Sequence, residues 1–468
     1  MPLIEPRPIP DPDDLGRVHF IAIGGAGMSG VAAGCLARGL TVSGCDQADS
    51  EALAELAGQG AQVMVGHDPS HLEGVDTVVV SSAIPDGNAE LAEARRRGLP
   101  VLHRSLALAS LMAGRRVVSV AGTHGKTTTT AMCVAGLRAA GSDPSYVIGA
   151  TMVDSGLAAH IGADREFVVE ADESDGTFRQ YPTAIAVITG IDPDHLDNYG
   201  TPENYEACFA QFAAGDTVEL VILDGDDPGA ARLRAALLQA GRPVLAYGRS
   251  PDCDLVLSEV ELDGATSRAR LTCRDWSATL RLVVPGVHNL RDAAAACCVA
   301  WRLGADLDRF LAGLAAFHGT ARRFQTVAVV DGVRVIDDYA HHPTEIAATV
   351  AAAREVVGDG RIIACFQPHL FSRTRDFADD FGRELARADQ VVVVDVYPAR
   401  EQPIPGVTGE LVAEAVRAHG GRVTYVPSLD DALDELAGTA RCGDLVLTIG
   451  AGSVTGLGPR LAARLGQP

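Results

Sequence analysis

The chain lacks any apolar run near the roughly 18 residues that a membrane-spanning helix requires. Its first residues, Met1–Pro6, contain no basic stretch followed by an apolar one and so do not form a secretory signal. The ten cysteines include no C-x-x-C pair, which argues against a disulfide or zinc framework and favours buried thiols in a reducing compartment. These absences predict a soluble cytoplasmic protein with no membrane partner.

Positive charge is also scarce. The net charge is −22 and the isoelectric point is about 4.9. Because a protein that binds long nucleic acid usually presents a basic face, we expect no nucleic-acid partner. Screening over ~8 Å at physiological salt still allows a local pocket to bind a small anion. Lys126 is the only lysine among 39 basic residues, and it lies in a Gly-Lys-Thr sequence.

Apolar runs typical of strands alternate with Ala/Leu/Arg-rich runs typical of helices through most of the 468 residues. This alternation predicts an α/β fold with parallel sheets. The length suits three domains, for which we predict the ranges 1–110, 111–322 and 323–468. The middle one is expected to include a small antiparallel element at 253–284.

The coarse pattern also gives individual elements. We predict strands at 17–23, 75–81, 116–121, 166–171, 184–190, 218–223, 361–366 and 391–396. We predict helices at 28–38, 126–140, 202–214, 226–240, 343–357, 374–388 and 455–465. A hairpin is expected to cross Asp331-Gly332.

A glycine-rich motif follows the first strand. Gly25, Gly27 and Gly30 have the G-x-G-x-x-G spacing, which lets the backbone turn tightly and approach a diphosphate at a helix N-terminus. Asp46 comes about 20 residues later, where it is placed to bind a ribose or a base. A tight turn without a ligand and an NAD site are the alternatives for this motif.

A second glycine-rich loop precedes Lys126. Residues 122–130 read Gly-Thr-His-Gly-Lys-Thr-Thr-Thr-Thr after the predicted strand Val117–Ala121. Such a loop offers backbone N–H groups to phosphates, the lysine bridges the β- and γ-phosphates, and the Thr127 hydroxyl reaches Mg²⁺. The usual first glycine of a P-loop is replaced by Val120, so we expect a tighter loop.

Carboxylates and a histidine follow the next two strands. Glu170 ends the strand before Ala-Asp-Glu-Ser-Asp, and we expect it to point into a site while the later acids of the segment are solvated. His195 stands among aspartates after the strand at 184–190, where it serves either as a ligand or as a structural hydrogen-bonding group. The carboxyl ends of parallel strands form the ligand crevice, so these groups are predicted to converge with Lys126.

The last third has its own polar cluster at two successive strand ends. Asp337–Pro343 reads Asp-Asp-Tyr-Ala-His-His-Pro, and Gln367–Arg373 reads Gln-Pro-His-Leu-Phe-Ser-Arg. We interpret the cluster as a second-substrate site that also reaches ATP. The alternative is helix capping and surface hydrogen bonding, with Pro343 as the first residue of a helix.

Together these segments resemble the Mur ligases, the ATP-dependent amino-acid ligases of peptidoglycan synthesis, over nearly the whole chain. The stretches that carry the resemblance are Gly24–Gly30, Gly122–Thr128, Glu170–Asp175, Asp194–Asp197, Pro285–Asn289, Asp337–His342 and Phe366–Arg373. The resemblance implies a Rossmann-like UDP-sugar domain, a central P-loop ATPase domain and a Rossmann-like C-terminal amino-acid domain. It is greatest to the branch that adds L-alanine to UDP-N-acetylmuramate, so these two molecules and ATP are the expected partners, with Mg²⁺ or Mn²⁺ as the metal.

The resemblance also implies roles for particular residues. The UDP-sugar is expected to contact Gly25, Ala26, Gly27, Met28, Ser29, Gly30, Asp46 and Ser81. ATP is expected to contact Gly122, Thr123, His124, Gly125, Lys126, Thr127, Thr128, His288, Asn289, Arg323 and Asp338. The amino-acid pocket is expected to contain Tyr339, His341, His369 and Arg373. Metal ligation is assigned to Thr127, Glu170 and His195, and catalysis to Lys126, Glu170, His195 and His341.

Two departures from the family pattern stand out. A second asparagine usually follows Asn289 by three residues, but this position is Asp292, which accepts a hydrogen bond and cannot donate one. We therefore expect altered base selectivity. Some relatives carry a carbamylated lysine near the metals, which a chain with Lys126 alone cannot have, in agreement with the alanine-adding branch.

The expected reaction activates the muramate carboxylate by attack on the γ-phosphate of ATP, which gives an acyl phosphate that the alanine amine then attacks. Three alternatives are open at this point. The first is a ligase that adds a preformed tripeptide in cell-wall recycling. The others are an NAD-dependent oxidoreductase and a nucleotide-binding regulator without catalysis. The oligomeric state is open.

Overall fold

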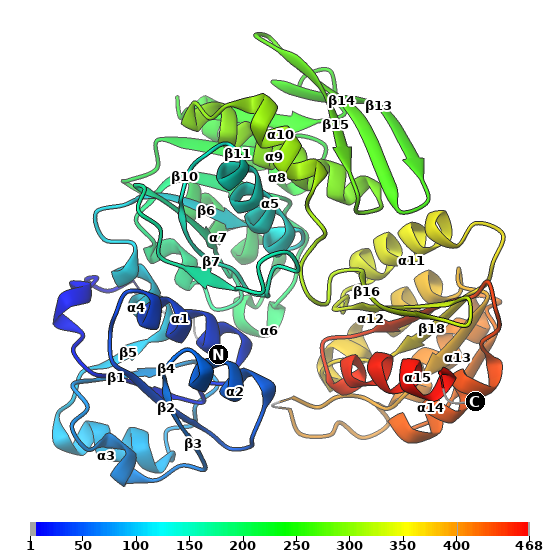
Figure 1. Ribbon diagram of the computed structural model, residues 1–468, viewed down its shortest axis with the longest axis horizontal. Helices are drawn as coiled ribbons and strands as arrows, with labels where there is room; N and C mark the ends of the chain where they lie inside the picture. Colours follow the sequence, from blue (N-terminus) through cyan, green and yellow to red (C-terminus); the bar gives the residue numbers. More distant parts are fainter. Residues whose placement is uncertain (1–5, 400, 467–468) are drawn as a thin grey trace. The chain divides into compact units, whose positions relative to one another are not determined.

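The computed structural model describes residues 6–399 and 401–466, and it confirms the α/β class. Three sheets of five, ten and six strands follow one another along the chain (Figure 1). The described residues group into two compact units. The first unit consists of residues up to Val260, Ala269–Arg281 and Asn289–Phe317, and the second of Glu261–Arg268, Leu282–His288 and residues from His318 onward. None of the described helices is long and apolar enough to cross a membrane.

The first sheet is entirely parallel, in the order β3-β2-β1-β4-β5. Its strands are β1 (Val18–Ile21), β2 (Val42–Asp46), β3 (Gln62–Val65), β4 (Thr77–Val80) and β5 (Val101–His103). The helices between and after them are α1 (Ala26–Ala37), α2 (Glu51–Gly58), α3 (Ala89–Arg97) and α4 (Arg104–Leu111). The order in which the strands are connected reverses between β1 and β4, and in parallel sheets ligands generally bind beyond the carboxyl ends of the strands at such a point.

The ten-stranded sheet has the order β15-β14-β13-β12-β11-β10-β6-β9-β7-β8. Its strands are β6 (Arg116–Ala121), β7 (Ser145–Val147), β8 (Ala159–His160), β9 (Glu166–Glu170), β10 (Thr183–Ile188), β11 (Leu220–Asp224), β12 (Val244–Gly248), β13 (Leu255–Asp263), β14 (Thr266–Cys273) and β15 (Ser277–Leu282). The central strands β9, β6 and β10 pair in parallel, so their carboxyl ends meet at one edge. Three consecutive strands, β13 to β15, occupy the segment where the small antiparallel element was predicted.

Six helices belong to the same part of the chain. They are α5 (Lys126–Ala139), α6 (Leu196–Tyr199), α7 (Pro202–Ala213), α8 (Pro228–Gln239), α9 (Val287–Leu303) and α10 (Leu307–Ala315). Helix α8 begins two residues later than predicted. The Asp227 side chain accepts a hydrogen bond from the Ala230 N–H and caps the helix, and Pro228 suits the first helical turn.

The six-stranded sheet has the order β16-β17-β21-β18-β19-β20. Its strands are β16 (Gln325–Val330), β17 (Val333–Asp338), β18 (Ile362–Phe366), β19 (Gln390–Val393), β20 (Val423–Tyr425) and β21 (Leu445–Ile449). Its helices are α11 (Pro343–Val357), α12 (Phe371–Leu385), α13 (Gly409–Ala418), α14 (Leu429–Thr439) and α15 (Leu457–Leu465). The predicted hairpin is confirmed: β16 and β17 are antiparallel, and the turn places Asp331 at φ 48° and Gly332 at φ 76°.

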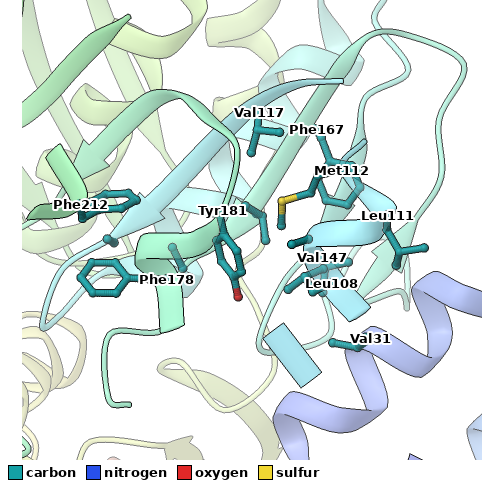
Figure 2. Close-up of a cluster of buried hydrophobic side chains, with 14 of the residues drawn as sticks. Val31, Leu108, Leu111, Met112, Val117, Val147, Phe167, Phe178, Tyr181 and Phe212 are labelled. Carbon is teal, nitrogen blue, oxygen red and sulfur yellow. The ribbon is translucent and has the colours of Figure 1, made fainter. Parts of the chain in front are cut away.

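A continuous apolar core explains why the first two sheets share one unit. Figure 2 shows Leu108 and Leu111 of α4 in the same cluster as Val147 of β7 and Phe167 of β9, and all four are buried. Helix α4 follows the first sheet directly, so its apolar face joins that sheet to the ten-stranded one. The domain limits at 110 and 322 remain a prediction.

Candidate active site

The loop between β6 and α5 has the backbone that a phosphate requires. Gly122 and Gly125 have φ angles of 133° and 80°, which side-chain-bearing residues rarely adopt. Gly125 is the N-cap of α5 and has no side chain to cap it. The first N–H groups of a helix lack partners within the helix, so this N-terminus is suited to an anion.

Lys126 begins α5, and its side chain folds back over the loop. Its ammonium donates hydrogen bonds to the carbonyl oxygens of Gly122 (2.6 Å) and Thr123 (3.1 Å) and pairs with Glu173 Oε2 at 2.9 Å. Burial opposes the positive charge, but the nearby carboxylates, Glu173 above all, outweigh it and raise the pKa of Lys126. The lysine therefore stays charged at neutral pH.

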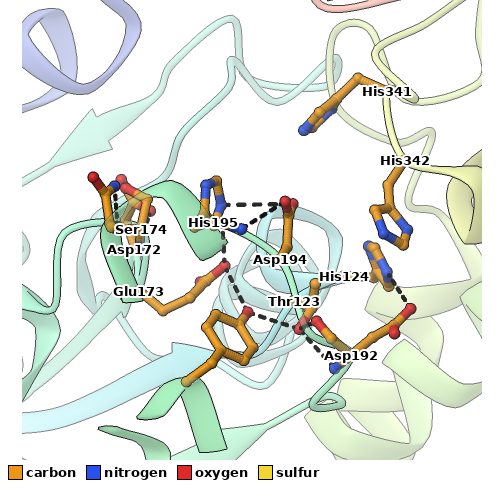
Figure 3. A network of polar contacts seen from close by, with 12 residues as sticks. Thr123, His124, Asp172, Glu173, Ser174, Asp192, Asp194, His195, His341 and His342 are labelled. Carbon is orange, nitrogen blue, oxygen red and sulfur yellow. Dashed lines mark hydrogen bonds and ion pairs between the residues drawn. The ribbon is translucent and has the colours of Figure 1, made fainter. Parts of the chain in front are cut away.

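Glu173 is the centre of the polar network in Figure 3, and its side chain is 1% exposed. Its Oε1 lies 3.8 Å from His195 Nε2 and accepts a hydrogen bond from the Tyr205 hydroxyl at 3.4 Å. The Tyr205 oxygen is also 2.8 Å from the Thr123 hydroxyl. Glu173 thus links the lysine, the histidine and the nucleotide loop.

The expectation that the later acids of this segment are solvated is wrong. Glu173 and Asp175 are buried, and Asp172 forms an ion pair with Arg104 at 2.7 Å. Arg104 is the first residue of α4, and its position depends on the packing of that helix against the central sheet. No sequence pattern identified Arg104 or the burial of Glu173.

Glu170 and Thr127, two of the predicted metal ligands, lie at the same edge of the sheet. Glu170 is the last residue of β9, and its Oε2 accepts a hydrogen bond from the Gly149 N–H at 2.7 Å. Thr127 follows the lysine and is buried. His195, the third, adopts a left-handed backbone at φ 54° before α6, and its Nε2 lies 3.7 Å from Asp194 Oδ2. Glu173 contacts both Lys126 and His195, so the lysine and the histidine share one polar network, whereas the convergence of Glu170 with Lys126 stays a prediction.

The remaining loop residues have structural partners. The Thr189 hydroxyl donates to the His124 carbonyl oxygen, and His124 Nε2 lies 3.4 Å from Asp192 Oδ2. Thr128 is the third residue of α5 and is partly exposed.

Asn289 and Asp292 lie on α9, and both are buried. A Cβ atom on Gly125 would lie 2.5 Å from Asp292 Oδ1, so this carboxylate lies directly against the nucleotide loop. His288, the residue before Asn289, belongs to the second compact unit.

The first glycine motif opens α1 as predicted, with Gly25 as its N-cap. Asp46 ends β2, and its Oδ2 accepts a hydrogen bond from the Gly24 N–H at 3.0 Å. A Cβ on Gly27 would lie 2.9 Å from Arg104 Nη1, so glycine allows the arginine to approach this loop. Arg104 therefore contacts both Asp172 and the first glycine motif.

The other residues of this predicted site surround the same helix start. Ala26, Gly27, Met28, Ser29 and Gly30 form the first residues of α1, and Met28 is buried. Ser81 follows β4 and is partly exposed. The neighbouring Ser82, which sequence reasoning missed, donates its hydroxyl to Asp175 Oδ2 at 3.3 Å.

In the second unit, three of the four residues of the predicted amino-acid pocket lie together after β17 and β18. The His341 ring lies 5.3 Å from the Tyr339 ring and 6.2 Å from the His369 ring, between centroids. Tyr397, which sequence reasoning missed, stacks on His369 at 5.8 Å. Arg373 is buried in the first turn of α12.

Arg323 and Asp338 lie beside this cluster. The Arg323 guanidinium lies 5.1 Å from the centre of the Tyr339 ring. Asp338 ends β17 and accepts hydrogen bonds from the N–H groups of Phe324 and Ala340. Burial raises the pKa of Asp338 to about 6.

Three family models cover most of the chain in order. The Mur ligase family catalytic domain matches residues 17–116, the Mur ligase middle domain matches 120–300, and the Mur ligase glutamate ligase domain matches 322–452. The chain belongs to the Mur ligase family. As a member of this family it is an ATP-dependent ligase.

Relatives of this Mur ligase span its full length. It is 55% identical to the UDP-N-acetylmuramate–L-alanine ligase of Cutibacterium acnes, with 99% of both chains covered. The crystal structure of a UDP-N-acetylmuramate–alanine ligase from Thermotoga maritima matches with a TM-score of 0.83 and 28% identity over 96% of this chain and 98% of that one. A murein peptide ligase from Psychrobacter arcticus shares the fold, with a TM-score of 0.73 and 24% identity over 97% of this chain and 99% of that one.

Proposed function

We propose that this Mur ligase joins L-alanine to the carboxylate of UDP-N-acetylmuramate and converts ATP to ADP and phosphate. The observation that carries the proposal is the Lys126–Glu173–His195 cluster at the nucleotide loop, in a chain 55% identical to a ligase of that name. The product is a precursor for peptidoglycan synthesis.

The chemistry requires activation because a carboxylate is a poor electrophile. An oxygen of the muramate carboxylate attacks the γ-phosphorus of ATP, and the bond from that phosphorus to the bridging oxygen breaks, which gives an acyl phosphate and ADP. The loop N–H groups and Lys126 stabilise the charge that develops on the transferred phosphoryl group. Glu173 orients Lys126 toward the loop.

The second step transfers the acyl group. The neutral amine of alanine attacks the acyl carbon, phosphate leaves, and the amine loses a proton. We assign the alanine pocket to Tyr339, His341, His369 and Arg373. The three rings lie near one another, and Arg373 lies in the first turn of α12. His341 is the proposed base for that proton.

The donor set of Thr127, Glu170 and His195 fits a divalent cation. A hydroxyl and a carboxylate are the hard oxygen donors that Mg²⁺ prefers, and imidazole also suits Mn²⁺. A bound ion would reduce the charge repulsion between the anionic substrates. The positions of Thr127 at the start of α5 and Glu170 at the end of β9 support this assignment.

The Gly25–Gly30 loop is the proposed UDP diphosphate site. The first N–H groups of α1 lack partners within the helix, and Asp46 fixes the preceding turn through Gly24. A ligase that consumes ATP and a UDP-sugar is proposed to work in the cytoplasm. The ten free cysteines suit that reducing compartment.

Phosphate release with ATP and UDP-N-acetylmuramate tests the function against L-alanine, glycine, L-serine and a cell-wall tripeptide. We expect release with L-alanine and little with the tripeptide. Lys126→Ala is expected to abolish alanine-dependent phosphate release. Glu203→Gln is the control, since Glu203 is an exposed residue of α7. Preference for the tripeptide, or Lys126→Ala activity within a few-fold of the parent, would refute the proposal.

A further inference from the structure

A buried polar cluster lies in the first sheet, and the proposed ligase chemistry does not use it. His19 of β1, Cys45 of β2 and Glu90 of α3 are each fully buried. His67 follows β3, and His71 lies in the 3-10 turn Pro69–Leu72. The side chains of these two histidines are 25% and 18% exposed, so they connect the buried group to the surface.

The donor atoms of this cluster are close together. Cys45 Sγ lies 2.8 Å from Glu90 Oε2 and 3.1 Å from His67 Nδ1. His67 Nδ1 lies 3.1 Å from Glu90 Oε2, and His71 Nδ1 lies 2.6 Å from Glu90 Oε1. The donor atoms of His19, Cys45 and Glu90 all lie within 4.8 Å of one another. Ligand atoms around a tetrahedral zinc ion are separated by about 3.3–3.8 Å, so small movements convert these contacts into a coordination sphere.

The histidine on β1 has a donor atom that the protein leaves unused. His19 Nε2 is buried without a hydrogen-bond partner and lies 3.8 Å from Glu90 Oε1. The other ring nitrogen of His19 is 2.9 Å from the Ser43 hydroxyl, which fixes the orientation of the ring. A buried polar atom without a partner costs free energy, and a bound cation would satisfy it.

We propose that Cys45, Glu90, His19 and His71 form a four-coordinate zinc site, with His67 next to these ligands on the surface side. One thiolate, two imidazoles and one carboxylate are the ligands that select Zn²⁺ over the hard cations Mg²⁺ and Ca²⁺. The site is separate from the ATP loop, and its existence does not depend on the proposed ligase reaction.

Zinc binding would deprotonate the Cys45 thiol. The Cys45 thiol donates to Glu90 in the metal-free protein, and burial followed by Glu90 raises the pKa of Cys45. Zinc binding therefore replaces the S–H bond with a Zn–S bond and releases one proton to solvent.

The cluster shares backbone with the first glycine motif. The Ile23 N–H donates to the Cys45 carbonyl oxygen at 2.9 Å, and the next residue, Asp46, holds the Gly24 N–H. A metal at Cys45 would therefore fix the strand end that carries this loop. These side chains come from β1, β2, α3 and the connection between β3 and β4, so cysteine spacing in the sequence did not identify them.

Cobalt substitution in the full-length protein tests the site. We expect chelator-treated protein to bind Co²⁺ with a sulfur-to-metal charge-transfer band in the near ultraviolet, which oxygen and nitrogen ligands do not give. The band should be lost in Cys45→Ser and retained in Cys442→Ser, whose exposed cysteine is the control. Absence of the band in the parent, or its persistence in Cys45→Ser, would overturn the proposal.

Two further measurements test the zinc site without a substitution at Cys45. X-ray absorption of the zinc-loaded parent should show one sulfur at about 2.3 Å together with nitrogen or oxygen ligands at about 2.0–2.2 Å. His71→Gln should weaken zinc binding roughly tenfold or more in competition with a chelating dye, since it removes one ligand and leaves the buried core intact. A zinc environment without sulfur, or unchanged affinity in His71→Gln, would contradict the site.

Discussion

The ammonium of Lys126 lies 2.9 Å from Glu173 Oε2, and Glu173 Oε1 lies 3.8 Å from His195 Nε2. One buried carboxylate therefore stands between the cation of the nucleotide loop and the imidazole that follows β10. The lysine cannot change its position without changing the environment of the histidine. This arrangement makes Glu173 a positioning residue for the ligase reaction.

Glu173→Gln removes the negative charge and keeps the shape of the side chain. We expect kcat to fall by roughly 10- to 100-fold, because Lys126 loses the partner that orients it toward the transferred phosphoryl group. The KM for ATP should change less. Steady-state ADP release with Glu203→Gln as the matched control checks this. Parent-like kcat in the Glu173 variant would contradict the assigned role.

Because Lys126 is the only lysine, its reactivity is measurable without interference from other side-chain amines. Reductive methylation should label it slowly at pH 7 and faster at pH 9, since the neighbouring carboxylates raise the pKa of Lys126 and the neutral amine is scarce. ATP should slow this labelling at least about tenfold, while the α-amino group serves as an internal control. Labelling that ATP does not slow would argue against phosphate contact by Lys126.

Gly125 tests the fit between the nucleotide loop and Asp292. Gly125→Ala places a Cβ 2.5 Å from Asp292 Oδ1 at a φ of 80°, so it adds a clash to about 1–2 kcal/mol of backbone strain. Gly114→Ala adds strain alone, since its φ is 71° and nothing lies within 4 Å of its Cβ. We expect Gly125→Ala to lower the Tm and raise the KM for ATP by more than Gly114→Ala does. Adding Asp292→Ala to Gly125→Ala should restore part of the lost Tm. If the double variant has the same Tm as Gly125→Ala, a clash with Asp292 is not the cause of the destabilisation.

The sequence predicted the parts of the site that depend on local pattern. A glycine loop between a strand and a helix placed Lys126, and parallel strand order brought the ends of β6, β9 and β10 together. Both follow from rules that act over a few residues or over neighbouring strands. Observed helix starts differ from the predicted ones where a capping residue determines the first helical residue, as Asp227 does for α8.

The contacts that sequence reasoning missed depend on packing between distant segments. Arg104 reaches Asp172 only because α4 packs against the central sheet, and Glu173, in the loop after β9, pairs with Lys126 at the start of α5. Tyr397 meets His369 through a single parallel bridge between two loops. Side-chain periodicity carries no information about such long-range contacts.

His103 makes the stability of the folded chain depend on pH. Its Nδ1 accepts a hydrogen bond from the Ser105 N–H and caps α4, which requires a neutral ring. Burial, which outweighs the attraction of nearby Asp175, lowers the pKa of His103 to about 4 from the ordinary 6.5. The unfolded chain therefore takes up a proton between pH 6.5 and 4 that the folded chain does not. The free energy of unfolding should fall over that range, by up to about 3 kcal/mol from this group.

His103→Asn keeps a capping acceptor and removes the titration, so the loss of stability between pH 7 and 4.5 should become smaller. Urea denaturation followed at both pH values measures the difference, and His318→Asn, at an exposed histidine, is the control. The change with pH is the quantity to compare, because the substitution alters packing at every pH. If the parent and His103→Asn lose equal stability between pH 7 and 4.5, protonation of His103 is not a cause of the acid destabilisation, and the prediction is wrong.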